Sequence, residues 1–119
     1  FISTNEFVQW AALAAFTTPS DFLETSRVAY RERRDLLLAG LNEVGLTCEM
    51  PAGAFYAFPD VTRINRDSRE AAEALLSRAQ VATVPGVVFG PHGEGHVRFS
   101  FSTPIETIAA GLESMRRNL

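Results

Sequence analysis

The chain has 119 residues, the length of one domain, and 46% of them are hydrophobic while 21% are charged, which excludes a disordered chain. The formal net charge of −3 argues against a nucleic-acid partner, because a phosphate backbone requires a basic surface. No apolar run reaches the roughly 20 residues of a membrane span, so we expect no membrane partner. Cys48 is the single cysteine and cannot form a disulfide within the chain, which is typical of a reducing, cytoplasmic compartment.

A helix is predicted to begin at a cap near Ser3 and to end at residues 17–19. Ser3 and Glu6 have the spacing of a capping box, in which each side chain satisfies a backbone N–H group of the other residue. Pro19 then ends the helix, because proline disfavours helical geometry in the residue before it.

A second, longer helix is predicted over residues 22–44. Ser20 or Asp21 can cap its beginning, and Gly45 stands where glycine commonly follows a helix end. Ordinary helices average about 11–12 residues. A helix of about twice that length often belongs to two layers or two domains at once.

The rest of the chain mixes short strands with two helices. The clearest strand covers residues 96–102, where Val97, Phe99 and Phe101 alternate with polar residues, as on a sheet with one covered face. A helix is predicted to follow Asp67 and to run to about Gln80. The other strand candidates are residues 46–49, 55–58, 81–84 and 87–89.

The last helix is predicted from Thr103, Pro104 and Glu106, which suit the N-cap, N1 and N3 positions, and from an apolar stripe behind them. The order of elements is therefore two helices, two strands, a helix, two strands and a helix. This order predicts an α+β fold with a small, mostly antiparallel sheet, helices packed on one of its faces, and a long connecting helix before it.

Arg98 is the first candidate for chemistry, because it falls on the polar face of the clearest strand. A guanidinium on a rigid strand presents a planar fork that matches a carboxylate through two hydrogen bonds. The alternative is a solvated arginine on a sheet surface.

Two glycine-containing segments are further candidates. Residues 84–90, Val-Pro-Gly-Val-Val-Phe-Gly, form an irregular turn before the Arg98 strand, and residues 51–56, Pro-Ala-Gly-Ala-Phe-Tyr, lead into two aromatic residues. The alternatives are a plain connection for the first segment and rings that fill the core for the second.

The other residues with reactive or distinctive side chains give weaker indications of a functional site. His92 and His96 have no convincing third ligand, so a metal site is not expected. Cys48 is interpreted as a buried structural thiol, and Trp10 as a packing residue. The sequence has no lysine, so Schiff-base chemistry is impossible within these residues.

Three segments in this order resemble a known family: residues 53–59 (GAFYAFP), 81–90 (VATVPGVVFG) and 93–101 (GEGHVRFSF). Together they look like the C-terminal, small-domain portion of class I/II pyridoxal-phosphate-dependent aminotransferases of fold type I, in the aspartate-aminotransferase-like branch. Residues 8–13 (VQWAAL) also resemble the helix that follows the catalytic lysine in these enzymes. The resemblance covers essentially the whole chain.

The resemblance implies a role for each part. Arg98 matches the arginine that grips the substrate α-carboxylate, and Phe55 matches a phenylalanine close to the substrate. Residues 1–20 would be a remnant of the large cofactor domain, residues 21–45 the inter-domain helix, and residues 46–119 the small C-terminal domain.

The whole enzyme would use pyridoxal 5′-phosphate to transfer an amino group between an amino acid and a 2-oxo acid, as a cytoplasmic homodimer. The cofactor-binding residues of the family have no counterparts here. We therefore expect the 119-residue chain to bind no cofactor and to be inactive alone. The alternative function is a non-catalytic α+β domain that binds small molecules or proteins.

Overall fold

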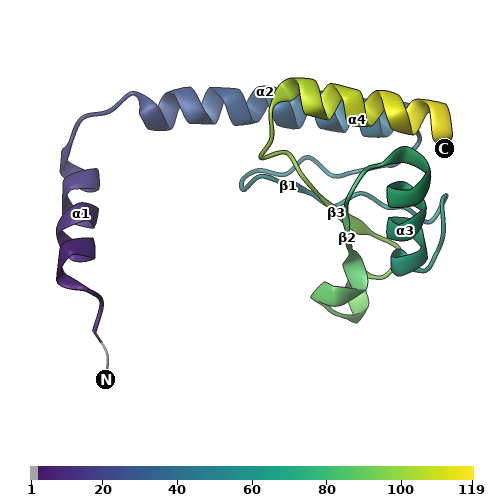
Figure 1. The fold of residues 1–119 in the computed structure, drawn as a ribbon, viewed down its shortest axis with the longest axis horizontal. Coiled ribbons are helices and arrows are strands. Elements are labelled where there is room, and N and C mark those ends of the chain that lie inside the picture. Colours follow the sequence, from purple (N-terminus) through teal and green to yellow (C-terminus); the bar gives the residue numbers. More distant parts are fainter. Residues whose placement is uncertain (1–2) are drawn as a thin grey trace.

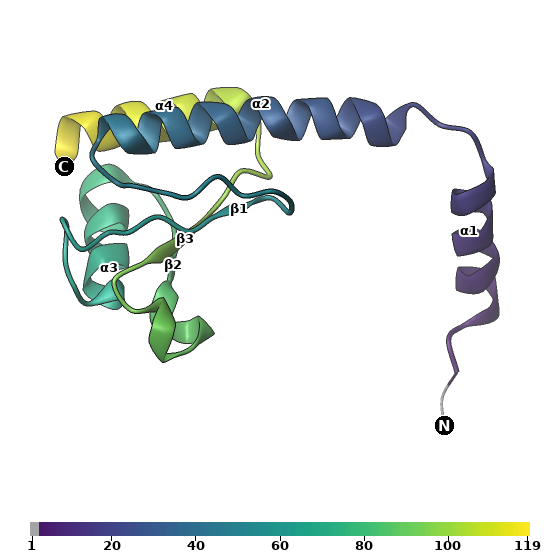
Figure 2. The same cartoon turned by 180° about the vertical axis from the view of Figure 1, so that it is seen from behind.

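The computed structural model describes residues 3–119, which contain four α-helices and a small three-stranded sheet (Figure 1). The first two residues of the predicted 1–20 segment lie outside the described part. Helix α1, Glu6–Thr17, stands apart from the other elements in Figures 1 and 2 and buries none of its residues. The predicted capping box is wrong, because Asn5 is the N-cap of α1 and makes no side-chain capping bond.

Helix α2, Phe22–Glu43, confirms the predicted long helix. Its end is a Schellman motif: Leu46 N–H donates to the Leu41 carbonyl (2.9 Å) and Gly45 N–H donates to the Asn42 carbonyl (3.0 Å). Gly45 has a φ of +77°, which a residue without a Cβ adopts at low cost. Leu41 and Leu46 are both buried, so the turn that ends the helix also closes the core.

Helix α3, Ser68–Ala79, begins as the sequence predicts. The Asp67 carboxylate accepts hydrogen bonds from the backbone N–H groups of Arg69 (2.8 Å) and Glu70 (3.2 Å). The helix ends at Gln80, whose left-handed backbone (φ 57°) turns the chain toward the sheet.

The sheet has the strand order β1–β3–β2, with both pairs antiparallel. Strand β3, Val97–Ser100, is central; β1 is Tyr56–Ala57 and β2 is Val84–Pro85. The register places Tyr56 opposite Ser100 and Val84 opposite Arg98. The predicted strands are thus found near residues 56, 84 and 98, although each is shorter than expected.

Two of the predicted strands are wrong. Residues 46–49 have no strand geometry, because Leu46 completes the turn after α2. Asp60 N–H donates to the Thr47 carbonyl (2.9 Å) without extending into a strand ladder. Residues 87–89 belong to a 3₁₀-helix, η1, Gly86–Phe89, which is followed by a second one, η2, Pro91–Gly93.

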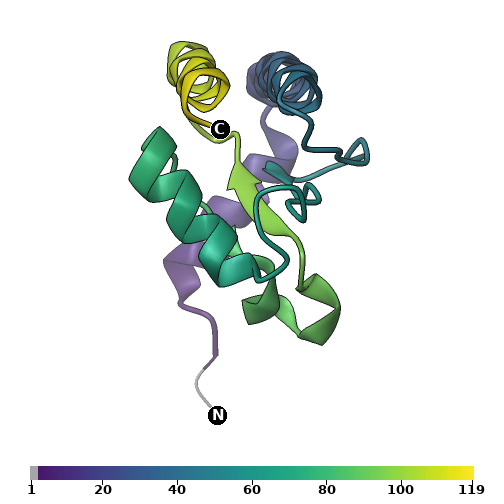
Figure 3. The same ribbon diagram turned by 90° about the vertical axis from the view of Figure 1, so that its right-hand side faces the viewer.

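Helix α4, Ile105–Asn118, buries Ile108, Leu112 and Met115 along one stripe, as predicted. It begins one residue later than expected, because Pro104 occupies the cap position and no side chain caps the helix. α4 lies beside α2 in all three views, and α3 contacts α4, β2 and β3 (Figure 3).

The α+β class and the packing of helices on one sheet face are confirmed, because the apolar side chains of β3 enter the core with residues of α2, α3 and α4. The buried core consists of Leu37, Leu38, Leu41, Leu46, Ala57, Val61, Ala71, Ala72, Leu75, Ala79, Val97, Phe99, Phe101, Ile108, Leu112 and Met115.

Candidate functional site

Arg98 projects from the sheet face opposite the core. Its neighbours on β3, Val97 and Phe99, are buried, so the alternation of a strand turns Arg98 to the other side, where it is half-buried. Val84 stands directly opposite Arg98 on β2. Arg98 belongs to the central strand, whose backbone is hydrogen-bonded on both edges. This rigid backbone limits the positions that the guanidinium can occupy.

Two aromatic rings hold the Arg98 guanidinium. Its Cζ atom lies 4.2 Å from the centre of the Tyr56 ring and 4.9 Å from the centre of the Phe89 ring, both within the range of a cation–π contact. The Nε atom is buried without a hydrogen-bond partner. Among residues 3–119 no carboxylate forms an ion pair with Arg98. The positive charge is therefore in place without an anion to balance it.

The turn over residues 84–90 brings Phe89 to this position. Gly86 N–H donates to the His96 carbonyl (2.8 Å), and Val87 N–H donates to the Ser68 hydroxyl (3.2 Å). A Cβ on Gly86 would overlap the carbonyl oxygen of Gly93, so the two segments touch backbone to backbone. These contacts connect η1 to the start of α3 and to the segment that precedes β3.

Glu94 connects the start of α3 to the segment before β3. Its carboxylate accepts hydrogen bonds from the backbone N–H groups of Ser68 (2.5 Å) and Gly95 (3.3 Å). The bond from Ser68 lowers the pKa of Glu94 below its ordinary value, because it stabilises the charged form. Ser68 is fully buried, and its two hydrogen bonds, one to Glu94 and one from Val87, connect the carboxylate to the backbone of η1.

Phe55, the second predicted site residue, is 38% exposed. The centre of its ring lies 4.4 Å from that of Tyr56 and 6.2 Å from that of Tyr30. Its carbonyl accepts a hydrogen bond from Phe101 N–H (3.0 Å), which fixes the backbone beside β3. The structure thus places Phe55 next to Tyr56, and Tyr56 next to Arg98.

Sequence reasoning missed Tyr56 and treated Phe89 only as part of a turn. Both were visible as aromatic residues inside the segments already selected. What brings them to one guanidinium is the pairing of β3 with a strand on each side, and no local pattern in the sequence reveals that pairing.

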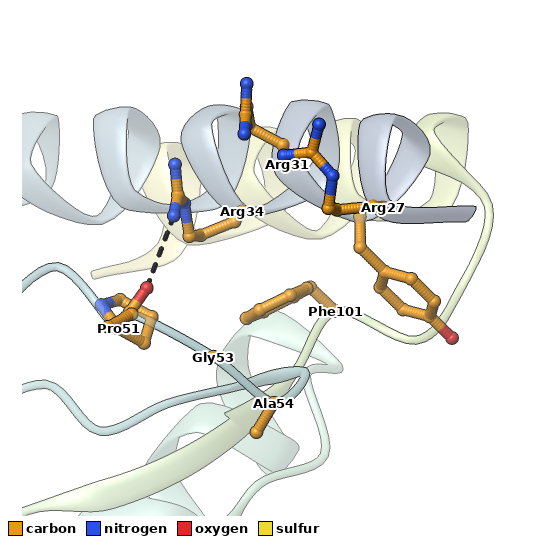
Figure 4. A pocket seen from close by; sticks show the side chains of 9 residues that line it. Arg27, Arg31, Arg34, Pro51, Gly53, Ala54 and Phe101 are labelled. Carbon is orange, nitrogen blue, oxygen red and sulfur yellow. Dashed lines mark hydrogen bonds between the residues drawn. The ribbon is translucent and has the colours of Figure 1, made fainter. Parts of the chain in front are cut away.

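A separate cavity of about 330 Å³ lies between α2 and the loop at residues 51–54 (Figure 4). Arg34 donates to the Pro51 carbonyl (3.3 Å) and so holds the loop against the helix. Arg27 is paired with Glu24 through two hydrogen bonds, one of 2.8 Å and one of 2.5 Å. The cavity has cationic walls, and no carboxylate, imidazole or thiol of residues 3–119 lines it. Its lining residues are Arg27, Tyr30, Arg31, Arg34, Pro51, Ala52, Gly53, Ala54 and Phe101.

The remaining sequence candidates form no reactive site. The His96 ring stacks on Phe58 with 5.3 Å between ring centres. No group of three metal-ligating side chains occurs within residues 3–119. Cys48 is half-buried and not fully buried as predicted, and this partial burial raises the pKa of its thiol. Trp10 is 64% exposed and lies outside the buried core of residues 3–119, so its predicted packing role stays a prediction.

None of the helices in residues 3–119 combines the length and the apolar character that crossing a membrane requires.

The sequence that builds this fold and site matches one family of proteins. Residues 1–115 match the family of class I and II aminotransferases, so the chain belongs to that family. It is 45% identical over 120 residues to the aspartate/prephenate aminotransferase of Thermus thermophilus, covering 98% of this chain and 30% of that protein. It is 39% identical over 115 residues to an aspartate aminotransferase of Pyrococcus abyssi, covering 95% of this chain and 30% of that protein.

Solved structures show the same fold. The aromatic aminotransferase of Pyrococcus horikoshii superimposes with a TM-score of 0.88 at 40% identity, over 93% of this chain and 30% of that chain. A mutant of the Thermus thermophilus aspartate aminotransferase superimposes with a TM-score of 0.86 at 46% identity, over 93% of this chain and 31% of that chain. The chain therefore spans about 30% of the length of these relatives.

Members of the family use pyridoxal 5′-phosphate. The residues of this chain do not fit that group, because the sequence contains no lysine and hence no side-chain amine for a Schiff base.

Proposed function

We propose that this chain is the C-terminal portion of an aminotransferase and that it binds the α-carboxylate of the amino acid and 2-oxo acid substrates through Arg98. The observation that carries the proposal is the Arg98 guanidinium, which is fixed on the central strand and has no carboxylate partner among residues 3–119. Phe55 would lie at the substrate-facing edge of the same site.

Arg98 would orient the substrate through two parallel hydrogen bonds from its guanidinium. The buried Nε atom faces protein, so the two Nη groups are the donors that remain for a carboxylate. Such a bidentate contact fixes the direction of the substrate as well as its position, and correct orientation lowers the barrier of the reaction that follows.

The domain boundaries belong to the same proposal. Residues 1–20 would be part of the large domain, residues 21–45 the inter-domain helix, and residues 46–119 the small domain. The exposure of large apolar side chains on α1 supports this division, because such side chains are normally covered by protein. They include Phe7 (70% exposed), Trp10 (64%) and Phe16 (90%).

The parts that this chain does not supply are also proposals. Pyridoxal 5′-phosphate would be bound by residues outside these 119, so the chain alone would be inactive as a transaminase. We further propose that the whole enzyme is a homodimer. A cytoplasmic location rests on the single cysteine of the sequence.

The test is steady-state kinetics of the full-length aminotransferase that carries this chain, with Arg98→Lys as the variant. Lysine keeps the charge but loses one hydrogen bond to a charged group, worth about 1.5–3 kcal/mol. We therefore expect kcat/KM for the amino acid to fall about 10- to 150-fold. Arg66→Lys, a change at an exposed arginine of the loop before α3, is the matched control and should leave kcat/KM unchanged. Wild-type kcat/KM in the Arg98 variant would remove Arg98 from this role.

A further inference from the structure

The guanidinium of Arg98 lies within a continuous row of rings on the outer face of the sheet. Tyr56 and Phe89 contact the guanidinium itself, at 4.2 Å and 4.9 Å. Phe55 continues the row beyond Tyr56, with 4.4 Å between ring centres, and Phe58 continues it beyond Phe89, with 6.0 Å between ring centres. Arg98 is thus one member of a partly exposed row of aromatic rings.

The two contacting rings reach Arg98 from opposite sides of β3. Tyr56 belongs to β1, and Phe89 follows β2, so each neighbour of the central strand contributes one ring. Tyr56 pairs with Ser100, two residues from Arg98, which places it diagonally across the strand pair on the same face. A planar guanidinium can stack on rings in a way that an ammonium group cannot.

A carboxylate partner within the chain would normally hold the guanidinium of an arginine in one orientation, and at Arg98 two ring contacts take that place. The Nε atom is buried and makes no hydrogen bond, so hydrogen bonding within the chain does not set the orientation of the guanidinium. An arginine side chain has many rotamers, and immobilising it when a ligand binds reduces affinity. Stacking that orders the side chain before the ligand arrives removes part of that loss.

We propose that Tyr56 and Phe89 are positioning residues that hold the Arg98 guanidinium in its carboxylate-binding orientation. The inference rests on the proposed role of Arg98. It goes beyond that role because it assigns the affinity for the carboxylate partly to two rings that need not touch the substrate.

The first test measures the stacking itself, by NMR of the 119-residue chain. The side-chain Hδ and Nε–H protons of Arg98 should resonate upfield of those of an exposed arginine such as Arg66, because ring currents shield protons over a ring face. Tyr56→Leu or Phe89→Leu should move them back toward ordinary positions. Ordinary Arg98 shifts in the wild-type chain would overturn the proposal without any variant.

The second test is kinetic and uses the full-length aminotransferase. Tyr56→Leu and Phe89→Leu should each raise KM for the amino acid about twofold to tenfold, the effect of immobilising one side chain on binding, and should change kcat less. Tyr56→Phe and Phe89→Tyr keep a ring at each position and should keep KM near the wild-type value.

The outcomes separate the two proposals. If Arg98→Lys impairs the enzyme while both leucine variants keep wild-type KM, the positioning role falls and the carboxylate role stands. If Arg98→Lys has no effect, the carboxylate role falls, and the NMR shifts still report whether the rings hold Arg98. If KM also rises in Tyr56→Phe and Phe89→Tyr, which keep a ring, positioning by the rings is contradicted.

Discussion

Replacement of Gly86 by alanine tests how the turn beside Arg98 is built. A Cβ at this position would overlap the carbonyl oxygen of Gly93 and lie 2.6 Å from the carbonyl oxygen of His96. Both neighbours are backbone atoms, so no side chain can rotate away to make room. The Gly86 N–H bond to the His96 carbonyl (2.8 Å) lies at the same point and would be disturbed.

The expected loss follows from two terms. A buried backbone N–H group that loses its partner costs about 1–3 kcal/mol, and forcing extra volume into packed structure costs about 1–3 kcal/mol. We expect Gly86→Ala to lower the free energy of unfolding by about 2–6 kcal/mol. For a chain of 119 residues, each kcal/mol corresponds to about 4 °C in Tm.

The assay is urea and thermal unfolding of the 119-residue chain, followed by circular dichroism. Gly53→Ala is the matched control, because a Cβ at Gly53 meets no atom within 4 Å and its backbone lies outside the left-handed region. That variant should be unchanged or more stable by up to about 1 kcal/mol, since alanine restricts the unfolded chain. Equal stability of the two variants would refute the backbone contact between the turn and the segment before β3.

Two further predictions concern the core and the acid response. Leu41→Ala should lower the free energy of unfolding by about 2–5 kcal/mol, because Leu41 is fully buried, whereas Leu76→Ala, at a side chain that is 50% exposed, should cost much less in the same denaturation experiment. Glu94 has its pKa lowered in the folded chain, so its contribution to stability is present above its ordinary pKa and is lost as the pH falls through the folded-state pKa. Glu94→Gln should therefore flatten the loss of stability in acid, and an unchanged pH profile of Tm would contradict this assignment.

The helices could be predicted because their signals are local. The spacing of Ile108, Leu112 and Met115 identifies the buried stripe of α4 without reference to any partner. Gly45 predicts the end of α2 because a left-handed residue is needed there.

The strands were less predictable because each depends on a partner far away in the sequence. β1 and β2 are two residues long and are held by β3, so their boundaries follow from pairing and not from composition. Residues 46–49 and 87–89 carry apolar side chains that suit a strand. The first segment closes a helix end, and the second winds into a 3₁₀-turn.

The candidate site also combines a residue that local sequence identifies with contacts that depend on long-range pairing. Arg98 could be selected from its own strand, because alternation places it on the polar face. Its contacts with Tyr56 and Phe89 join residues 42 and 9 positions away along the chain, and they arise only when three strands are in register. The capping box at Ser3 and Glu6 shows the opposite error, since a correct spacing was present but the capping bond did not form.

The most direct measurement is a crystal structure of the full-length aminotransferase with maleate, the dicarboxylate named with a solved Thermus thermophilus relative. The account predicts one carboxylate of maleate within about 2.7–2.9 Å of both Nη atoms of Arg98, with Tyr56 and Phe89 still stacked on the guanidinium. A maleate held by other cationic groups, with Arg98 turned away from it, would contradict the account.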